Sequence, residues 1–234
     1  MMNAKPLRVR ILRQDQQNRS DIDVPPSARD TYRHGDLRRA LLGAAVDLAR
    51  EGGPQAIVLR EATRRAGVAP NAAYRHFASH RALFDAVRGV ALAEVARAME
   101  AELAPAEALP DPSERARAML AAVGRGYLAF AQRETGLFRT AFFGDDARAT
   151  DWPDDARPVG DTGMGPFQLL SHALDAMVQA GALAAGRRPG AEYLAWSAVH
   201  GLALLCIEGP LRRADAAHRL QLAARLLRMV EVGL

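Results

Sequence analysis

A tight turn between two short helical segments constrains this chain more than any other feature of its sequence. The segment from Leu59 to Ala66 has a helical pattern, and Gly67 follows it, where glycine can take the positive φ that ends a helix at low cost. Val68 turns the chain, and Pro70 then begins a second helix, because proline is tolerated in a first turn whose N–H groups lack intrahelical partners. This arrangement predicts a helix-turn-helix, the unit that reads double-stranded DNA.

The second helix, predicted over residues 70–77, has two different faces. At about 100° per residue, Ala73 and Phe77 point to one side and anchor the helix. Three side chains point to the opposite side, toward a DNA groove: Asn71, Ala72 and Arg75.

Four side chains of this helix have chemistry that suits DNA. Asn71 and Arg75 are the expected base readers, because asparagine pairs with adenine and arginine with guanine in the major groove. Tyr74 and His76 lie on the flanks, where they are expected to contact phosphates. The alternative is a helical hairpin within a core, with Asn71 and Arg75 on a solvated face.

Charge is distributed unevenly along the 234 residues. Residues 1–88 hold 16 Lys and Arg against 9 Asp and Glu, a net charge of +7, whereas residues 89–234 hold 15 against 18, a net charge of −3. The basic part is the helix-turn-helix part, which is the asymmetry that phosphate binding needs.

Composition bounds the compartment and the class of protein. The apolar residues form short periodic runs, and none approaches the roughly 20 residues of a membrane helix. Residues 1–19 contain no apolar signal-peptide region, and Cys206 is the only cysteine, so no disulfide or CxxC site can form within the chain. A cytoplasmic protein without membrane association is therefore expected.

Helical periodicity divides the chain into three parts. Residues 1–33 lack it and predict a flexible arm, whose Arg29 and Arg33 either reach a minor groove or make no contact. Residues 34–80 form the predicted three-helix DNA-binding domain, which begins with a helix from Asp36 to Gly53. Residues 81–234 form a second predicted domain, which is also helical.

The pattern of that second domain is helical throughout. Ser79 is a predicted N-cap for a helix that runs toward Leu103, and a break with three prolines follows at residues 104–112. No β-alternation appears, so the fold class is all-α. The remaining helices are expected at residues 113–133, 136–143, 166–180, 191–208 and 214–232, with a loop at residues 144–165.

The residues from Tyr32 to about Val95 resemble the TetR/AcrR family of transcriptional regulators. The resemblance rests on HGDLRRALLGAAVDLAREGG and LREATRRAGVAPNAAYRHFASHRALF, above all on the Gly67-Val68 turn and on residues 74–77. The C-terminal half is similar to a WHG domain, because Trp196 is followed after three residues by His200-Gly201.

The resemblance implies a homodimeric repressor, or less often an activator, that releases a palindromic operator when a small effector binds. By this resemblance Tyr74 and His76 touch phosphates, Arg60 touches the DNA backbone, and three residues face bases: Asn71, Ala72 and Arg75. Several positions depart from the family pattern, among them Ala62-Thr63, which stands where a branched apolar residue and alanine are usual. Ala69 stands where a serine often caps the reading helix, and His80 stands where a phosphate-binding lysine is common.

An effector pocket is expected among the middle helices, where aromatic residues concentrate. The candidates are Tyr127, Phe130, Phe138 and Phe142, with His200 as a polar anchor. Plain core packing is the alternative for these aromatic residues, and a core position with a satisfied ring is the alternative for His200.

The dimer interface is expected on the last two helices, which pair with their copies in the family. Both have wide apolar faces, and Gly201 would permit close helix approach. The predicted interface residues are Trp196, Gly201, Leu220 and Leu227.

Two rival classes remain open at this stage. An enzyme is disfavoured because the six histidines are scattered and no HExxH, GxSxG, GxGxxG or P-loop occurs, so no catalytic residue, metal or cofactor is expected. The carboxylate pairs Asp145-Asp146 and Asp154-Asp155 are either solvated loop charges or a cation site. A nucleoid protein would bind DNA with little sequence preference, whereas a regulator gains roughly 10³-fold or more at its operator.

Overall fold

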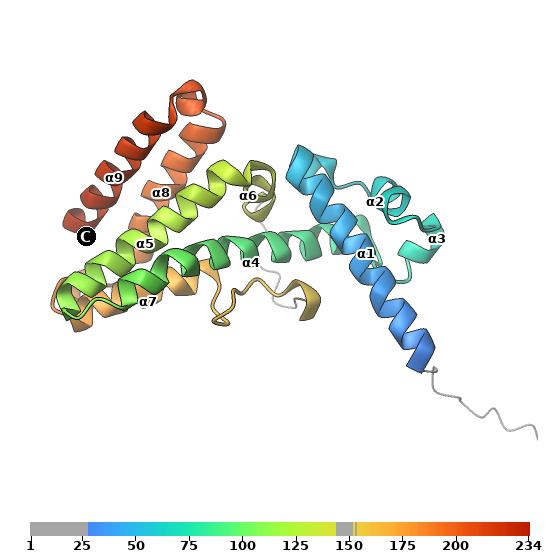
Figure 1. Cartoon of the computed structure of the whole chain (residues 1–234), viewed down its shortest axis with the longest axis horizontal. Helices are drawn as coiled ribbons and strands as arrows, with labels where there is room; N and C mark the ends of the chain where they lie inside the picture. Colours follow the sequence, from blue (N-terminus) through green and yellow to red (C-terminus); the bar gives the residue numbers. More distant parts are fainter. Residues whose placement is uncertain (1–27, 144–151, 153) are drawn as a thin grey trace, which may run out of the picture.

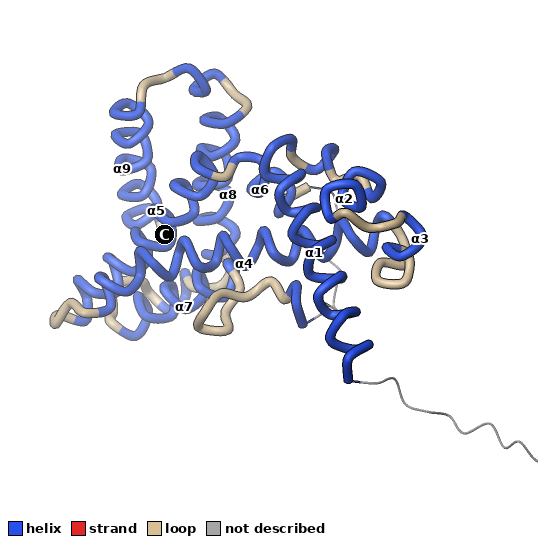
Figure 2. The backbone as a smooth tube through the Cα atoms, turned by 45° about the vertical axis from the view of Figure 1, so that its right-hand side comes forward, coloured by secondary structure: helices blue, strands red, loops and turns tan. Residues whose placement is uncertain are grey.

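The computed structural model describes residues 28–143, 152 and 154–234; for residues 28–36 and for Pro70 it describes the backbone alone. The described chain is all-helical and contains no β-strand, which confirms the predicted fold class. Figure 1 shows one long helix, α4 (His80–Glu107), running between the group of helices that precedes it in the chain and the bundle that follows it. Figure 2 shows the same division from another side.

The first group contains the predicted helix-turn-helix. Helix α1 spans Ala28–Gly52, the 3-10 turn η1 spans Pro54–Ala56, α2 spans Leu59–Ala66 and α3 spans Pro70–Ala73. The buried residues of α1 recur at the spacing of one helix face and meet α2 and α4 in a common core: Leu41, Ala45, Leu48, Ile57, Ala62, Phe77 and Leu83.

Helix α4 spans His80–Glu107 and joins the two groups. Ser79 caps it as predicted, since its hydroxyl accepts a hydrogen bond from the Ala82 N–H at 3.1 Å. The helix continues into the predicted break and ends at Glu107, because Pro105 lies in its last turn and removes only one backbone hydrogen bond there. The boundary predicted between residues 80 and 81 therefore falls at the first residue of a helix that serves both groups.

The second group is a bundle packed around α4. It is built by α5 (Pro112–Arg133), α6 (Thr135–Ala141), the 3-10 turn η2 (Asp154–Ala156), α7 (Pro166–Gln179), the 3-10 turn η3 (Ala185–Arg187), α8 (Ala191–Ile207), the 3-10 turn η4 (Pro210–Arg213) and α9 (Ala216–Gly233). Helices α4 and α5 pack along much of their length, and α8 and α9 lie side by side on the outside of the bundle.

Three of the predicted helix boundaries differ from those in the structure. Helix α1 begins at Ala28, so residues 28–33 are helical and do not belong to the arm; the rest of the arm, 1–27, lies outside the described residues. Helix α3 ends at Ala73, four residues before the predicted Phe77. Helix α6 ends at Ala141, two residues before the predicted end at residue 143, because the backbone of Phe142 leaves the helical region with φ −113° and ψ 14°.

No helix in the described part of the chain combines the length and the apolar character that crossing a membrane requires.

Candidate DNA interface and effector pocket

The turn between α2 and α3 has the predicted geometry. Gly67 adopts φ 68° and ψ 30°, the left-handed conformation, and its N–H bonds to the carbonyl of Arg64 at 3.3 Å. The N–H of Val68 bonds to the carbonyl of Thr63 at 3.0 Å, so the end of α2 is closed by backbone partners. A side chain at residue 67 would strain this conformation, which is why glycine occupies the turn.

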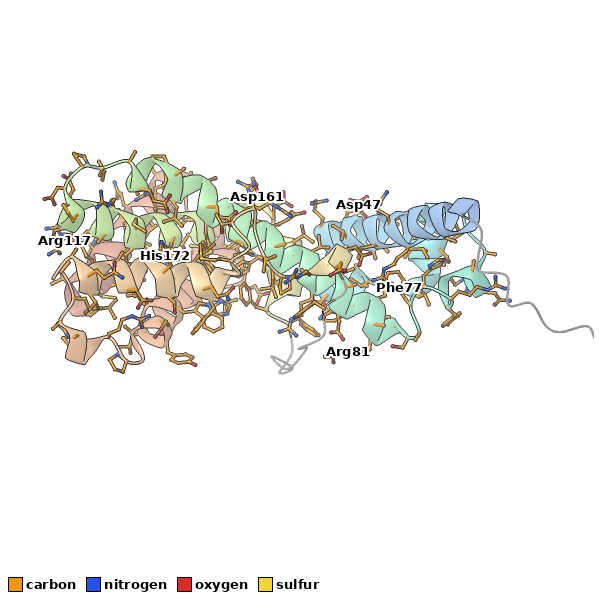
Figure 3. All side chains as sticks on the ribbon, turned by 90° about the horizontal axis from the view of Figure 1, so that it is seen from below. Asp47, Phe77, Arg81, Arg117, Asp161 and His172 are labelled. Carbon is orange, nitrogen blue, oxygen red and sulfur yellow. The ribbon has the colours of Figure 1, made fainter. Side chains whose placement is uncertain are left out.

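The reading segment, residues 70–77, is one turn of helix followed by a hydrogen-bonded turn. Ala69 caps α3 without a side-chain hydrogen bond, in agreement with the missing serine. The N–H groups of His76 and Phe77 both bond to the carbonyl of Ala73 at 2.9 Å. Phe77 is 2% exposed, so its ring anchors the segment in the core as predicted. Figure 3 shows Phe77 in the part of the molecule formed by α1 to α3.

The expected DNA-contacting side chains of this segment point to solvent. Asn71 and Arg75 are exposed, and Tyr74 is 59% exposed. Arg60 is exposed at the start of α2, and Ala72 is half-buried. Within the described part of the chain, no hydrogen bond or ion pair holds the side chains of Asn71, Tyr74 and Arg75. They are therefore available to a partner.

Two other arginines of α2 are already engaged. Arg64 pairs with Glu61 at 2.6 Å, and Arg65 pairs with Glu51 at 2.7 Å and with Glu61 at 3.3 Å. Hydrogen bonding to Arg64 lowers the pKa of Glu61 to about 2, so this carboxylate stays charged near neutral pH. The basic charge offered to DNA by α2 is thereby concentrated on Arg60.

His76 and His80 are held by the protein itself. The carbonyl oxygen of His76 accepts a hydrogen bond from Arg38 Nη1 at 2.9 Å, and its half-buried ring lies at the edge of the segment. His80 donates through Nε2 to the carbonyl oxygen of Ile57, which ties the start of α4 to the residues before α2. Because a carbonyl only accepts, Nδ1 of a neutral His80 is an acceptor, and only the protonated ring can donate to a phosphate.

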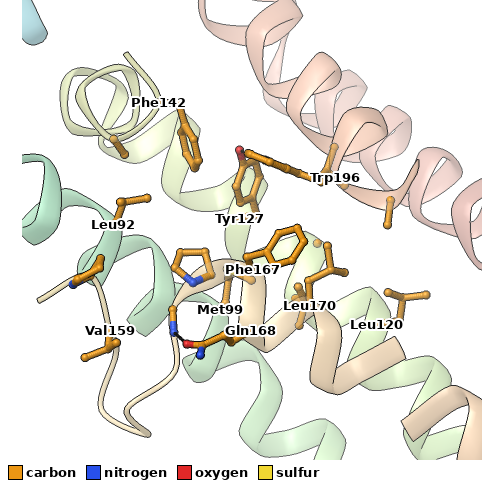
Figure 4. A pocket seen from close by; sticks show the side chains of 18 of the residues that line it. Leu92, Met99, Leu120, Tyr127, Phe142, Val159, Phe167, Gln168, Leu170 and Trp196 are labelled. Atoms are coloured by element: carbon orange, nitrogen blue, oxygen red, sulfur yellow. Dashed lines mark hydrogen bonds between the residues drawn. The ribbon is translucent and has the colours of Figure 1, made fainter. Parts of the chain in front are cut away.

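A cavity of about 370 Å³ lies between the helices α4 to α9 of the bundle, a size within the range of small-molecule sites. Figure 4 shows the rings of Tyr127, Phe142, Phe167 and Trp196 around it. Arg88 is the only charged residue among the described residues that line it, and its Nε donates to the carbonyl of Ala141 at 3.2 Å. The wall is otherwise mainly apolar: Leu92, Met99, Leu120, Val123, Leu170, Ala195, Val199, Leu227 and Val230.

The polar groups of the cavity wall are mostly satisfied by one another. The Tyr127 hydroxyl accepts from Trp196 Nε1 at 3.1 Å and bonds to His200 Nδ1 at 2.7 Å. Burial raises the pKa of Tyr127 and lowers the pKa of His200, so both groups are neutral near pH 7. A hydroxyl with two such partners has one hydrogen-bonding position left for a ligand. The cavity therefore suits an apolar, uncharged molecule with few polar groups.

The pocket residues predicted from the sequence lie in different places. Tyr127 and Phe142 line the cavity. Phe138 is buried behind them, with its ring centroid 5.2 Å from that of Tyr127. Phe130 faces a groove between α4 and α5 on another side, and His200 stands behind the wall as a histidine with a satisfied ring nitrogen.

Two of the residues predicted for the dimer interface, Trp196 and Leu227, line the cavity. Helices α8 and α9 are apolar on more than one face, so periodicity alone could not tell the inner face from the outer one. Gly201 is on the outer side of α8, where an added Cβ would meet nothing within 4 Å, and Leu220 is 68% exposed on α9. These two positions remain compatible with an interface.

The other predicted groups have structural roles or are not described. Cys206 is buried, and burial raises the pKa of its thiol, as expected of a small core residue. Asp155 binds Arg38 with both oxygens, at 2.8 and 3.0 Å, so its carboxylate is engaged by an arginine. Asp145-Asp146 lies outside the described residues, and no cluster of metal-ligating side chains occurs among the described ones.

Comparison with solved structures shows that the whole described arrangement recurs. A protein of unknown function from Rhodococcus sp. RHA1 is 27% identical, with a TM-score of 0.67 over 87% of this chain and 97% of that one. A putative TetR-family transcription regulator from Shewanella sp. PV-4 is 19% identical, with a TM-score of 0.53 over 82% of this chain and 95% of that one. The regulator FadR from Bacillus subtilis, solved with stearoyl-CoA, is 13% identical, with a TM-score of 0.52 over 84% and 98%.

Comparison with protein families covers both groups of helices. No curated protein matches the chain significantly. The family described as bacterial regulatory proteins of the tetR family matches residues 41–87, which contain the helix-turn-helix. The family described as Tetracyclin repressor-like, C-terminal domain matches residues 120–230, which contain Trp196, His200 and Gly201. The chain belongs to the TetR family of transcriptional regulators and carries a C-terminal domain of the WHG type.

Proposed function

We propose that this regulator binds a palindromic operator as a homodimer and that an apolar small molecule in the bundle cavity controls this binding. The observation that carries the first part is the reading segment, which buries Phe77 and leaves Asn71, Tyr74 and Arg75 exposed without partners in the described chain. Asn71 and Arg75 read bases in this proposal, Ala72 lies against the groove, and Tyr74, His76 and Arg60 contact the DNA backbone.

Selection of bound sequences from a random duplex library tests this assignment. The parent protein should enrich a palindromic motif, and Asn71→Ala should relax preference at one or two base positions in each half-site, at a cost of about 1–3 kcal/mol per lost base contact. Tyr74→Phe should weaken binding to all duplexes about equally, because phosphates carry no sequence information. An Asn71→Ala profile identical to that of the parent would contradict the base-reading role, and no enrichment by the parent would contradict operator binding.

The cavity supports the second part of the proposal. Its described lining is mainly apolar and aromatic, and Arg88, the one charged residue among the described residues that line it, already donates to a backbone carbonyl. FadR, which shares the fold, is solved with stearoyl-CoA, so a chain with this fold can hold a molecule with a long apolar part. We infer that the effector is neutral where it contacts the wall and that it hydrogen-bonds with Tyr127.

N-phenyl-1-naphthylamine is a suitable probe, because it is neutral and apolar and has one N–H group. Its fluorescence should rise when the parent protein is added, and Ala195→Trp should weaken binding roughly tenfold or more, since overfilling a packed site costs about 1–3 kcal/mol. Ala195 is 3% exposed and lines the cavity. Ala184→Trp, on the exposed residue before η3, is the matched control and should bind the probe like the parent. If both variants bind the probe equally well, the probe does not bind in this cavity.

The homodimer is proposed to form through the outer faces of α8 and α9. Leu194 is 63% exposed and Leu205 is 45% exposed, and the spacing 194, 201, 205 places both on the same side of α8 as Gly201. Leu220 adds apolar surface on α9. Apolar side chains exposed on two adjacent helices are the surface that a four-helix bundle between two copies would bury.

A further inference from the structure

Arg38 of α1 connects the reading segment to the bundle. Its Nη1 donates to the carbonyl oxygen of His76 at 2.9 Å, and its guanidinium lies over the ring of Phe77, 4.4 Å from the centroid. Its Nε and Nη2 donate to the two carboxylate oxygens of Asp155 at 2.8 and 3.0 Å, a bidentate pair. One planar cation thus contacts the end of the reading segment on one side and η2 on the other.

The segment that carries Asp155 also forms part of the cavity wall. Pro158 and Val159 follow it by three and four residues and line the cavity. The segment then reaches α7, whose first two residues, Pro166 and Phe167, line the cavity as well. A molecule that enters the cavity therefore contacts the same stretch of chain that binds Arg38.

Farther along, this stretch is fastened to α4 by backbone hydrogen bonds. The carboxylate of Glu100 accepts from the N–H of Asp161 at 2.8 Å and from the N–H of Thr162 at 3.0 Å, and Asp161 pairs with Arg97 at 3.1 Å. Figure 3 shows Asp161 well along the molecule from Phe77. Because the far end is held, displacement of residues 158–159 would be passed toward η2.

Gly89 of α4 sets the position of η2. A Cβ built on Gly89 would collide with the carbonyl oxygen of Ala156 and would lie 2.7 Å from the ring of Trp152. Both neighbours are close enough that something would have to shift. The missing side chain at residue 89 is therefore what lets η2 lie against α4 and present Asp155 to Arg38.

We propose that Asp155, acting through Arg38, holds the end of the reading segment in place, and that the cavity acts on DNA binding through this same contact. This inference rests on the proposed function for its regulatory consequence. Arg38 is a positioning residue: it bonds to the backbone at residue 76 and stacks on the anchor at residue 77. If η2 moves, Arg38 loses two of its three hydrogen bonds, and the reading segment loses a restraint. By reciprocity, a probe that displaces η2 and operator DNA must weaken each other's binding by the same factor.

Hydrogen exchange of the whole chain without DNA tests the contact, read at the amides of His76 and Phe77. Asp155→Asn should speed their exchange by up to about fivefold, the range expected for the loss of a partly exposed ion pair. Asp154→Asn, on the adjacent exposed residue of η2, is the matched control and should exchange like the parent. Equal exchange in these two variants would overturn the proposal.

Two glycine variants test the role of η2 without altering a charge. Gly89→Ala should speed exchange at residues 76 and 77 even though alanine favours a helix by about 1 kcal/mol over glycine. Gly43→Ala is the control, because a Cβ at this exposed position of α1 would meet nothing within 4 Å. If both variants exchange at residues 76 and 77 as slowly as the parent, the proposed role of η2 in holding the reading segment is wrong.

The same exchange experiment, repeated with N-phenyl-1-naphthylamine present, tests whether the cavity is coupled to the reading segment. The probe should speed exchange at residues 76 and 77 in the parent and should not change the exchange rates of the Asp155→Asn variant. An equal response in both proteins would show that the cavity does not act on the reading segment through Asp155. Failure of the parent to select any duplex would count against the proposed operator binding alone, because none of these measurements contains DNA.

Discussion

Phe77→Ala should lower the free energy of unfolding by about 3–5 kcal/mol, the largest loss expected of any substitution in the DNA-binding part. The ring is 2% exposed and is packed in the core that α1, α2 and α4 share. Its removal leaves a cavity and also removes the surface on which the Arg38 guanidinium rests. Urea unfolding followed by circular dichroism measures the loss.

The same variant should bind every duplex weakly, roughly tenfold or more below the parent after correction for the folded fraction, because the turn that presents Tyr74 and Arg75 has lost its anchor. Phe167→Ala is the matched control. Phe167 is 42% exposed at the cavity, so the expected loss in the free energy of unfolding is only on the order of 1 kcal/mol. Losses of equal size in the two variants would show that Phe77 does not anchor the reading segment.

The features that the sequence predicted well depend on chemistry within a few residues. Gly67 takes the left-handed conformation because of its own missing side chain, and Ser79 caps α4 through an N–H three residues away. The early end of α3 was missed for a tertiary reason. The backbone after Ala73 continues as a turn that carries Phe77 into the core, and Arg38, 38 residues away from His76, holds that turn.

The cavity could be predicted only in part. Its wall residues come from six helices, α4 to α9, and from loop residues that include 158 and 159. Which residues line the cavity therefore depends on packing across the bundle. Aromatic content identified Tyr127 and Phe142 but did not separate them from Phe130 and Phe138, which are buried elsewhere. The pairing of Asp155 with Arg38 could not be predicted from the sequence either, because the two residues lie 117 positions apart.

Gly201→Arg should convert the protein to a monomer and lower its affinity for the selected operator by about 10²–10⁴-fold, the gain that two linked binding modules supply over one. A dimer places its two reading segments on half-sites about one DNA turn apart, and a monomer can hold only one of them. In the proposed interface an arginine at residue 201 would bury an unpaired charge, which costs several kcal/mol. Sedimentation velocity reports the oligomeric state, and titration of the operator reports the affinity.

The fold of each single chain should survive this change, which makes the experiment decisive. A Cβ at Gly201 meets nothing within 4 Å, and arginine favours a helix more than glycine does. Gly186→Arg adds the same charge at an exposed position of η3, also with nothing within 4 Å of the new Cβ, and should remain dimeric with full operator affinity. A Gly201→Arg protein that stays dimeric would move the interface away from this face of α8, whereas a monomer with full affinity would show that one reading segment suffices.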